Sequence, residues 1–325
     1  MRAAVLYHPD EDLRVVGDWP EPTAGPGEVT VQVKGVGICG SDLALLAGHR
    51  RPPVLPWVPG HETLGEIVAA GPGADPGRVG ERVVVEPNLP CFGCPACRTG
   101  RTSACARRVS LGFTEPGTLA ERITVPAGFA WAVPDDWTDE DAVCAEPMAV
   151  ALAAIRRAGD AGRGRWLVIG AGSQGVLLCL ALVARGIAPY VLEPHPGRLQ
   201  LAEELGAKAA ADDDRGFDLV FETSGAPAAF AESLRRTARG GSIMLIGMSD
   251  EPLSLTTQTV VSRQLSLRGS LIYDHPGDFA ATLRSSVREL RPGRVLRACY
   301  PLAEAAAAFA AARAVPGKTW IRVSP

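Results

Sequence analysis

The chain has no long apolar stretch. Its 325 residues contain no uninterrupted apolar run approaching the roughly 18 residues that a membrane-spanning helix needs. The N-terminal segment also lacks the apolar core of a secretory signal. We therefore expect no membrane span and no membrane partner, and we predict a cytoplasmic location.

An excess of positive charge is also missing. The formal net charge is −3, which gives no support to a nucleic-acid or anionic-membrane surface. Lysine is scarce, with three residues (Lys34, Lys208 and Lys318) beside 30 arginines. Together with the abundant alanine and glycine, we interpret this imbalance as a coding bias toward GC-rich codons and not as a binding surface.

The eight cysteines do not follow the pattern of a disulfide framework. Four of them lie close together with the spacing C-x2-C-x2-C-x7-C, and the others are scattered along the chain. Four thiolates at such spacing suit a tetrahedral Zn²⁺ ion, and a site closed by four thiolates has no open position for a substrate. We therefore predict a structural zinc lobe over residues 88–108, with ligands Cys91, Cys94, Cys97 and Cys105.

A second, looser set of metal-ligand residues lies elsewhere. Cys39 is in a glycine-rich turn, His61 and Glu62 are adjacent, and Glu146 precedes an alanine-rich stretch. Each of these residues taken alone is more often a core or hydrogen-bonded side chain. Their occurrence together with the four-cysteine lobe suggests a second zinc site with an open position for catalysis.

The pattern of the chain changes near residue 149. Residues 1–148 are rich in proline, glycine and short apolar runs, such as 29–33, 65–69 and 82–86, which predict strands. From 149 to 274, short apolar runs alternate with helical stretches, which is typical of a parallel sheet covered by helices. The predicted strands of this part are 165–169, 189–193, 217–222, 242–246 and 266–271, and its predicted helices are 173–185 and 198–205. After residue 274 we predict two helices, 276–290 and 302–313, and a final strand, 319–323.

A glycine-rich turn joins the first of these strands to its helix. The sequence Gly170-Ala-Gly172-Ser-Gln-Gly175 fits G-x-G-x-x-G in the strand–helix context that a dinucleotide site requires. The helix N-terminus, beginning at Ser173 and Gln174, then offers amide donors to a pyrophosphate.

The cofactor preference depends on the end of the next strand. Glu193 lies 18 residues beyond Gly175, where a carboxylate binds ribose hydroxyls and repels a 2′-phosphate. This favours NAD over NADP. Arg198 opposes that preference if it pairs with a phosphate, and it leaves the preference intact if it only stabilises the helix or stacks on adenine.

Taken together, the chain resembles the zinc-dependent medium-chain dehydrogenase/reductase family, in its sorbitol-, glucose- and cyclitol-dehydrogenase branch. The resemblance covers nearly the whole length and is carried by the four-cysteine lobe and by 37–42, 59–62, 146–147, 170–175 and 240–247. It implies an α/β protein with two domains. A GroES-like β-barrel catalytic domain (1–148 and 275–325) would carry an inserted Rossmann domain with a doubly wound parallel sheet (149–274), and substrate and nicotinamide would meet in the cleft between them.

The resemblance also implies roles for individual residues. Cys39, His61 and a glutamate would hold the catalytic zinc, and whether Glu62 or Glu146 is the ligand stays open. Asp42 would accept a hydrogen bond from His61, and Ser41 would take the substrate proton. The predicted activity is NAD(P)-dependent oxidation of a secondary alcohol of a polyol, sugar or cyclitol, or the reverse reaction. The family often pairs its last Rossmann strand across a two-fold axis, which predicts a homodimer or homotetramer.

Two other functions compete with this prediction. The segment 111–121 is similar to 2-deoxy-scyllo-inosamine dehydrogenases of aminoglycoside pathways, which would make the substrate an aminocyclitol. A non-catalytic binding protein would instead use the zinc lobe and its arginines as a contact surface. About two zinc ions per chain would favour the dehydrogenase, and about one would favour the binding protein. The segment 211–217 lacks a helix that the family usually carries, so the Rossmann domain is predicted to be trimmed there.

Overall fold

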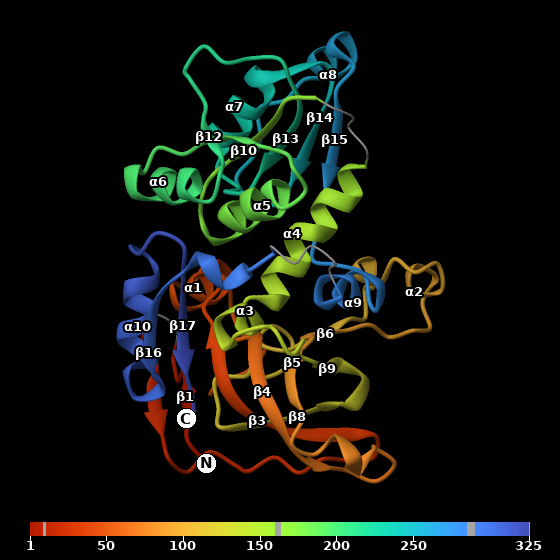
Figure 1. The fold of residues 1–325 in the computed structure, drawn as a ribbon, viewed down its shortest axis with the longest axis vertical. Helices are drawn as coiled ribbons and strands as arrows, with labels where there is room; N and C mark the ends of the chain where they lie inside the picture. Colours follow the sequence, from red (N-terminus) through yellow and green to blue (C-terminus); the bar gives the residue numbers. More distant parts are fainter. Residues whose placement is uncertain (9–10, 160–163, 285–289, 325) are drawn as a thin grey trace. The chain divides into compact units, whose positions relative to one another are not determined.

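Strands from the two ends of the chain pair in one sheet. Near the C-terminus, β17 (Lys318–Arg322) runs antiparallel to β3 (Glu28–Gly37), with Ile321 opposite Val36. Valines at alternate positions of β3 point to one side and are fully buried in a core that also holds Ile321. Two segments separated by most of the sequence therefore form one structural unit (Figure 1).

The structure is a computed structural model that describes residues 1–8, 11–159, 164–284 and 290–324. Two units can be distinguished. The first comprises Met1–Glu146, Phe279–Arg284 and the chain from Arg291 onward, and the second contains Pro147–Asp278. The chain leaves the first unit within α4 (Ala145–Ala158) and returns within α9 (Gly277–Leu283).

The main sheet of the first unit has seven strands in the order β16-β17-β3-β4-β5-β9, with β8 also paired to β3. Its neighbours are antiparallel, except that β16 runs parallel to β17. The other strands of this sheet are β4 (Glu62–Ala70), β5 (Arg82–Val85), β8 (Arg122–Pro126), β9 (Ala130–Ala132) and β16 (Leu296–Pro301).

Short pairs of strands and short helices complete this unit. The two-stranded sheets are β1 (Ala3–Val5) with β2 (Arg14–Val16), and β6 (Asn88–Leu89) with β7 (Val109–Ser110). The α-helices are α1 (Gly40–Leu46), α2 (Pro95–Arg98), α3 (Asp139–Val143) and α10 (Ala305–Ala312). The 3-10 helices are η1 (Pro76–Arg78), η2 (Thr102–Ala104), η3 (Ala127–Phe129), η4 (Pro292–Val295) and η5 (Leu302–Glu304).

The second unit contains a six-stranded parallel sheet in the order β12-β11-β10-β13-β14-β15. The predicted α/β fold is confirmed in this arrangement. The strands are β10 (Trp166–Ile169), β11 (Tyr190–Leu192), β12 (Lys208–Ala209), β13 (Phe217–Glu222), β14 (Thr237–Leu245) and β15 (Ser266–Gly269). Helix α5 (Ser173–Val183) contacts β10, and α6 (Pro196–Glu204) contacts β11 and β12. Helix α7 (Pro227–Arg236) contacts β13 and β14, and α8 (Thr257–Arg263) contacts β14.

Several predicted boundaries were wrong. Strand β14 starts at Thr237, five residues before the predicted start, and the predicted helix 302–313 consists of η5 followed by α10. Of the predicted helix 276–290, the structure shows α9, and residues 285–289 lie outside the described part of the chain. The trimmed connection is confirmed, because a turn and no helix joins β12 to β13. Within the described residues, no helix is both long and apolar enough to cross a bilayer.

Candidate metal centres and cofactor loop

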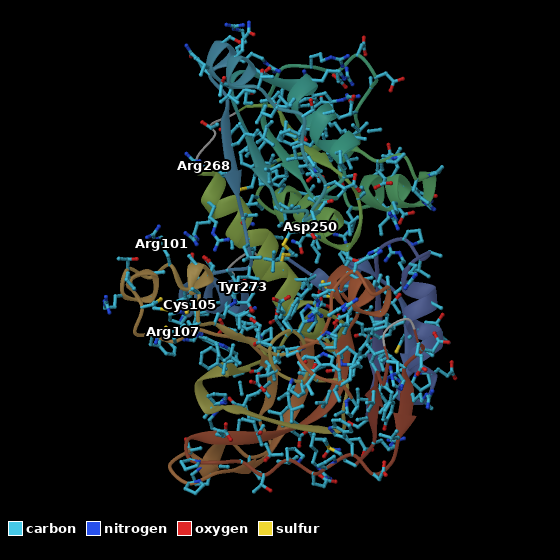
Figure 2. The ribbon with its side chains drawn as sticks, turned by 180° about the vertical axis from the view of Figure 1, so that it is seen from behind. Arg101, Cys105, Arg107, Asp250, Arg268 and Tyr273 are labelled. Atoms are coloured by element: carbon cyan, nitrogen blue, oxygen red, sulfur yellow. The ribbon has the colours of Figure 1, made fainter. Side chains whose placement is uncertain are left out.

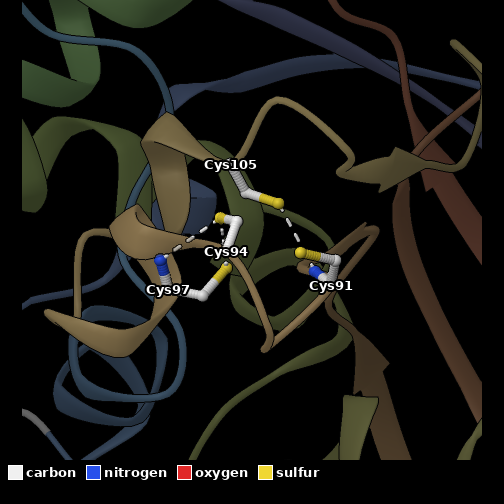
Figure 3. A group of neighbouring side chains, drawn as sticks. All are labelled: Cys91, Cys94, Cys97 and Cys105. Carbon is white, nitrogen blue, oxygen red and sulfur yellow. Dashed lines mark hydrogen bonds between the residues drawn. The ribbon is translucent and has the colours of Figure 1, made fainter.

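Four cysteine sulfurs converge in the lobe that follows β6. Cys94 precedes α2, Cys97 lies within it, and Cys105 follows η2, so two short helical turns bring the side chains together (Figure 3). The four Sγ atoms lie within 4.8 Å of one another, and those of Cys94 and Cys97 are 3.5 Å apart. Tetrahedral Zn²⁺ with Zn–S bonds of about 2.3 Å requires sulfurs about 3.8 Å apart, so the geometry fits the ion.

The electrostatics of this lobe also suit a cation. The amide of Gly93 is the main cause that lowers the pKa of the Cys91 thiol to about 6. Burial, followed by the neighbouring Cys94 and Cys105, raises the pKa of Cys97 to about 12. Crowded thiolates repel one another, so full deprotonation of all four requires a bound positive ion. Arginines lie on the same lobe (Figure 2), and Nη2 of Arg107 lies 3.4 Å from Sγ of Cys91.

The second group of potential ligands lies at the end of β3 and the start of β4. Cys39 caps α1 shortly after β3, His61 directly precedes β4, and Glu62 is the first residue of β4, which is paired to β3. One ligand atom from each of these three residues lies within 4.8 Å of the other two. Glu146, at the start of α4, is buried but does not belong to this group.

Asp42 holds this group in place from α1. Its carboxylate accepts hydrogen bonds from the backbone amides of Cys39 at 3.0 Å and of Gly60 at 3.2 Å. Oδ1 also lies 3.4 Å from Nδ1 of His61, which is within ion-pair distance but outside hydrogen-bond alignment. This orientation leaves Nε2 of His61 as the nitrogen for a metal ion.

Burial and charge oppose each other at His61 and Asp42. Burial disfavours the charged form of His61, but Asp42 and Cys39 outweigh it, so the pKa of His61 is raised well above its ordinary value. Burial likewise acts to raise the pKa of Asp42, yet His61 and the two amides hold this pKa below its ordinary value. In the chain without metal, a proton and a metal ion therefore compete for His61.

Glu62 has a partner that the sequence analysis missed. The Lys318 ammonium donates a hydrogen bond to Oε1 of Glu62 at 2.7 Å and lies 2.5 Å from Oε2, and both side chains are buried. The contact to Oε2 is an ion pair outside hydrogen-bond alignment. The only signal in the sequence was the rarity of lysine, because Lys318 is one of three lysines in an arginine-rich chain.

The residues present fit a zinc ion by their chemistry. The group offers one thiolate, one imidazole and one carboxylate, which are all zinc ligands found in proteins. Among the described residues, the buried Oγ of Ser41 has no hydrogen-bond partner. Buried polar atoms are normally satisfied, so this oxygen suggests that a further group completes the site.

The glycine-rich turn of the second unit has the geometry of a phosphate loop. Gly170 has φ +90°, and a Cβ at Gly175 would lie 2.0 Å from the carbonyl oxygen of Gly170, so neither position tolerates a side chain. A Cβ at Gly172 would meet open space, which leaves room for a ligand at the N-terminus of α5. The side chain of Gln174 donates to the carbonyl of Pro147 at 3.3 Å.

Glu193 lies beside this loop after β11. Its Oε2 accepts from the amide of Ala171 at 2.7 Å, and its Oε1 accepts from the amide of His195 at 2.8 Å. Each carboxylate oxygen has a second lone pair, so Glu193 is able to accept from ribose hydroxyls as well. Arg198 lies in the first turn of α6, three residues after the cap His195. A chain that combines a parallel sheet carrying this loop with a second unit carrying a metal-ligand group is typical of metal-dependent oxidoreductases that use a dinucleotide.

Comparison with protein families agrees with this class. Residues 25–135 match the alcohol dehydrogenase GroES-like domain, and residues 175–288 match the zinc-binding dehydrogenase domain. The chain is 31% identical to L-threonine 3-dehydrogenase of Pectobacterium carotovorum over 83% of both chains. It is 30% identical to sorbitol dehydrogenase of Bacillus subtilis, with 84% of this chain and 82% of that one covered.

Solved structures show the same fold over the whole chain. The rspB alcohol dehydrogenase from Escherichia coli CFT073, in complex with NADH, has a TM-score of 0.92 and 27% identity over 99% of each chain. Galactitol-1-phosphate dehydrogenase from Escherichia coli has a TM-score of 0.90 and 27% identity over 99% of this chain and 100% of that one. The chain belongs to the zinc-dependent alcohol dehydrogenase family, and its two units are the GroES-like and Rossmann-like domains of that family.

Proposed function

We propose that this protein is a zinc-dependent NAD(P) dehydrogenase that oxidises a secondary alcohol of a polyhydroxylated substrate to a ketone, or catalyses the reverse reaction. The observation that carries the proposal is the convergence of Cys39, His61 and Glu62 within 4.8 Å. Three protein ligands leave a fourth position for the substrate oxygen. The related sorbitol and galactitol-1-phosphate enzymes act on polyols by name, which supports this substrate class.

Cys39 and Nε2 of His61 would be two ligands of the catalytic ion, and a glutamate would be the third. Lys318 compensates the charge of Glu62 and contacts both of its carboxylate oxygens, so Glu62 would bind an ion through a lone pair that the ammonium does not use. Glu146 would serve as the alternative ligand. A zinc ion held there would act as a Lewis acid toward an alcohol or carbonyl oxygen.

Ser41 would take up the proton of the substrate hydroxyl. Its Oγ is buried and has no hydrogen-bond partner, and it lies two residues after Cys39 in α1. In the overall reaction, the carbinol carbon loses a hydride to a nicotinamide cofactor and the hydroxyl loses a proton, so that two electrons leave the substrate.

The loop Gly170–Gly175 would bind the cofactor pyrophosphate, and Ser173, Gln174 and Arg198 would lie close to it. Glu193 would bind the ribose hydroxyls and thus favour NAD over NADP. The four cysteines of the lobe would hold a second, structural zinc ion.

A homodimer, or a homotetramer built from such dimers, would form through β15. This strand is an edge of its sheet with β14 as its neighbour, and exposed Leu271 and Val261 flank it. A second copy pairing there would continue the sheet. Light scattering during gel filtration measures this directly, and a monomeric mass would reject it.

The function is tested by metal analysis and by NADH formation on a panel of polyols, sugars and cyclitols. We expect about two zinc ions per chain and turnover of at least one alcohol that is lost in Cys39→Ser. One zinc ion per chain, or turnover that survives Cys39→Ser, would contradict the assignment. The relatives do not indicate whether the substrate carries an anionic group, because galactitol 1-phosphate and L-threonine carry one and sorbitol does not.

A further inference from the structure

An arginine of the first unit lies close to the metal-ligand group and has no acidic partner in the described part of the chain. The guanidinium carbon of Arg50 lies 4.3 Å from the centre of the Phe113 ring, and its Nη2 donates to the carbonyl of Gly112 at 3.0 Å. Its Nε is buried without a hydrogen-bond partner. Among the described residues, Arg50 forms no ion pair, although a guanidinium has several further donors.

Phe113 links Arg50 to the proposed catalytic site. The Phe113 ring packs against the imidazole of His61 with their centres 4.9 Å apart. One aromatic ring therefore separates the Arg50 guanidinium from a proposed zinc ligand. The position is fixed by the backbone, because the amides of Gly117 and Thr118 donate to the carbonyls of Val58 and Gly60 and bring the Phe113 turn against the His61 segment.

The surroundings leave the charge of Arg50 uncompensated at short range. Burial lowers the pKa of Arg50, and the charges of Asp42 and Cys39 oppose that effect from a distance. The Asp42 carboxylate is already occupied by the amides of Cys39 and Gly60. Elsewhere in the protein, the half-buried Arg82 and Arg157 have carboxylates within 3.2 Å.

We propose that Arg50 is a specificity-determining residue that binds an anionic group, a carboxylate or a phosphate, carried by the substrate alcohol. This inference rests on the proposed dehydrogenase function. A planar guanidinium suits the paired oxygens of such groups, and stacking on Phe113 fixes its plane before the ligand arrives. Binding an anion there would also satisfy donors that the protein leaves unused.

A purely structural role for Arg50 makes a different prediction. If the side chain only supports Phe113 and Gly112, its loss would slow neutral and anionic substrates equally. If it binds an anion, the loss falls mainly on the anionic substrate. The ratio of kcat/KM values for an anionic substrate and its counterpart without the anionic group therefore separates the two roles.

The test uses matched pairs of alcohols: galactitol with galactitol 1-phosphate, and L-threonine amide with L-threonine. In the zinc-loaded wild type, we expect at least one pair to show a preference of about ten-fold or more for the more anionic member. Arg50→Met should reduce that preference at least about ten-fold, and Arg50→Lys should restore part of it. Arg51→Met, which changes the neighbouring exposed arginine, should leave the preference unchanged. The pair that responds distinguishes phosphate from carboxylate.

Equal losses for both members of each pair, or no preference in the wild type, would overturn the inference. If none of the four alcohols is oxidised, the result counts against the proposed function and not by itself against Arg50. A binding measurement then tests Arg50 directly. Inorganic phosphate or acetate should then raise the melting temperature of wild type and Arg51→Met more than that of Arg50→Met, in which the proposed phosphate loop Gly170–Gly175 is still intact. Equal shifts in the three proteins would reject anion binding by Arg50.

Discussion

Lys318 and Glu62 form a buried ion pair directly beside the proposed catalytic ligands. The ammonium lies 2.7 Å from Oε1, and the two side chains are 1% and 0% exposed. Lys318 also donates to the carbonyl of Ile38 at 3.0 Å, so the pair connects the C-terminal strand β17 to the segment that carries Cys39. Burial acts to lower the pKa of Lys318, but Glu62 outweighs it and raises this pKa, so the lysine stays charged.

Removing the lysine should strongly destabilise the first unit. Lys318→Met leaves a buried carboxylate without its counter-charge, which typically costs about 3–5 kcal/mol. Urea denaturation of the metal-free protein measures the free energy of unfolding. As a control, Lys34→Met breaks the half-exposed pair of Lys34 with Glu66, which should cost less than about 1 kcal/mol.

The double variant Glu62→Gln/Lys318→Met gives a second check. It removes both charges, so we expect it to recover at least about half of the stability lost in Lys318→Met. No recovery would mean that Lys318 acts through packing and not through the charge of Glu62.

Gly37 leaves the space that this ion pair occupies. A Cβ at Gly37 would lie 2.1 Å from Oε2 of Glu62 and 3.1 Å from Cε of Lys318. Gly37→Ala should therefore displace the carboxylate, destabilise the protein by about 1–3 kcal/mol and weaken metal binding at the Cys39 group. Gly128→Ala is the matched control, because a Cβ there meets nothing within 4 Å.

Calorimetric unfolding and zinc affinity measured by competition with a chelator report the two effects of Gly37→Ala. A variant as stable as wild type, with unchanged zinc affinity, would show that Glu62 has room to move and is not held in place.

The two proposed zinc sites should be separable by single substitutions. Cys39→Ser should lower the zinc content from about two to about one per chain and abolish turnover, because a proposed ligand of the open site is lost. Cys94→Ser should also remove about one zinc ion, but from the lobe, and it should lower the melting temperature. Elemental analysis with the activity assay distinguishes the sites, and Cys299→Ser, at an exposed cysteine, should change neither quantity. A normal zinc content in Cys39→Ser would remove this residue from the ligand set.

Local patterns predicted the sheet of the second unit well and the contacts of the first unit poorly. Short apolar runs indicated β10 and β13, because buried parallel strands are mostly apolar: β10 is apolar throughout, and β13 is apolar except for Asp218 and Glu222. The family resemblance implied only that residues 275–325 belong to the first domain, and nothing in the sequence indicated that β17 pairs with β3. Lys318 and Glu62 are separated by 256 positions in the sequence, so no periodicity relates them.

The site shows the same division between local and distant signals. Cys39, His61 and the four lobe cysteines were found because their residue types are rare and reactive. Phe113 and Arg50 were missed, since a phenylalanine and an arginine carry no such signal in this chain. Phe113 lies in a turn more than 50 residues beyond Cys39, and backbone hydrogen bonds to 58–60 bring that turn to His61. Arg50 is near His61 because its guanidinium lies over the Phe113 ring.

Glu193 should have two separable effects on the cofactor. Glu193→Ala removes the proposed ribose acceptor, so the preference for NAD over NADP in kcat/KM should fall by about ten-fold or more. It also removes the acceptor for the Ala171 amide, so the loop Gly170–Gly175 loses a support and KM should rise for both cofactors. Glu193→Gln keeps an acceptor oxygen without the charge, so it should reduce the preference for NAD but raise KM less than Glu193→Ala does.

Glu203→Ala, on α6, serves as the control that leaves both the preference and KM unchanged. An unchanged NAD/NADP ratio in Glu193→Ala, with KM raised for both cofactors, would restrict Glu193 to supporting the loop and would leave the cofactor preference to other residues.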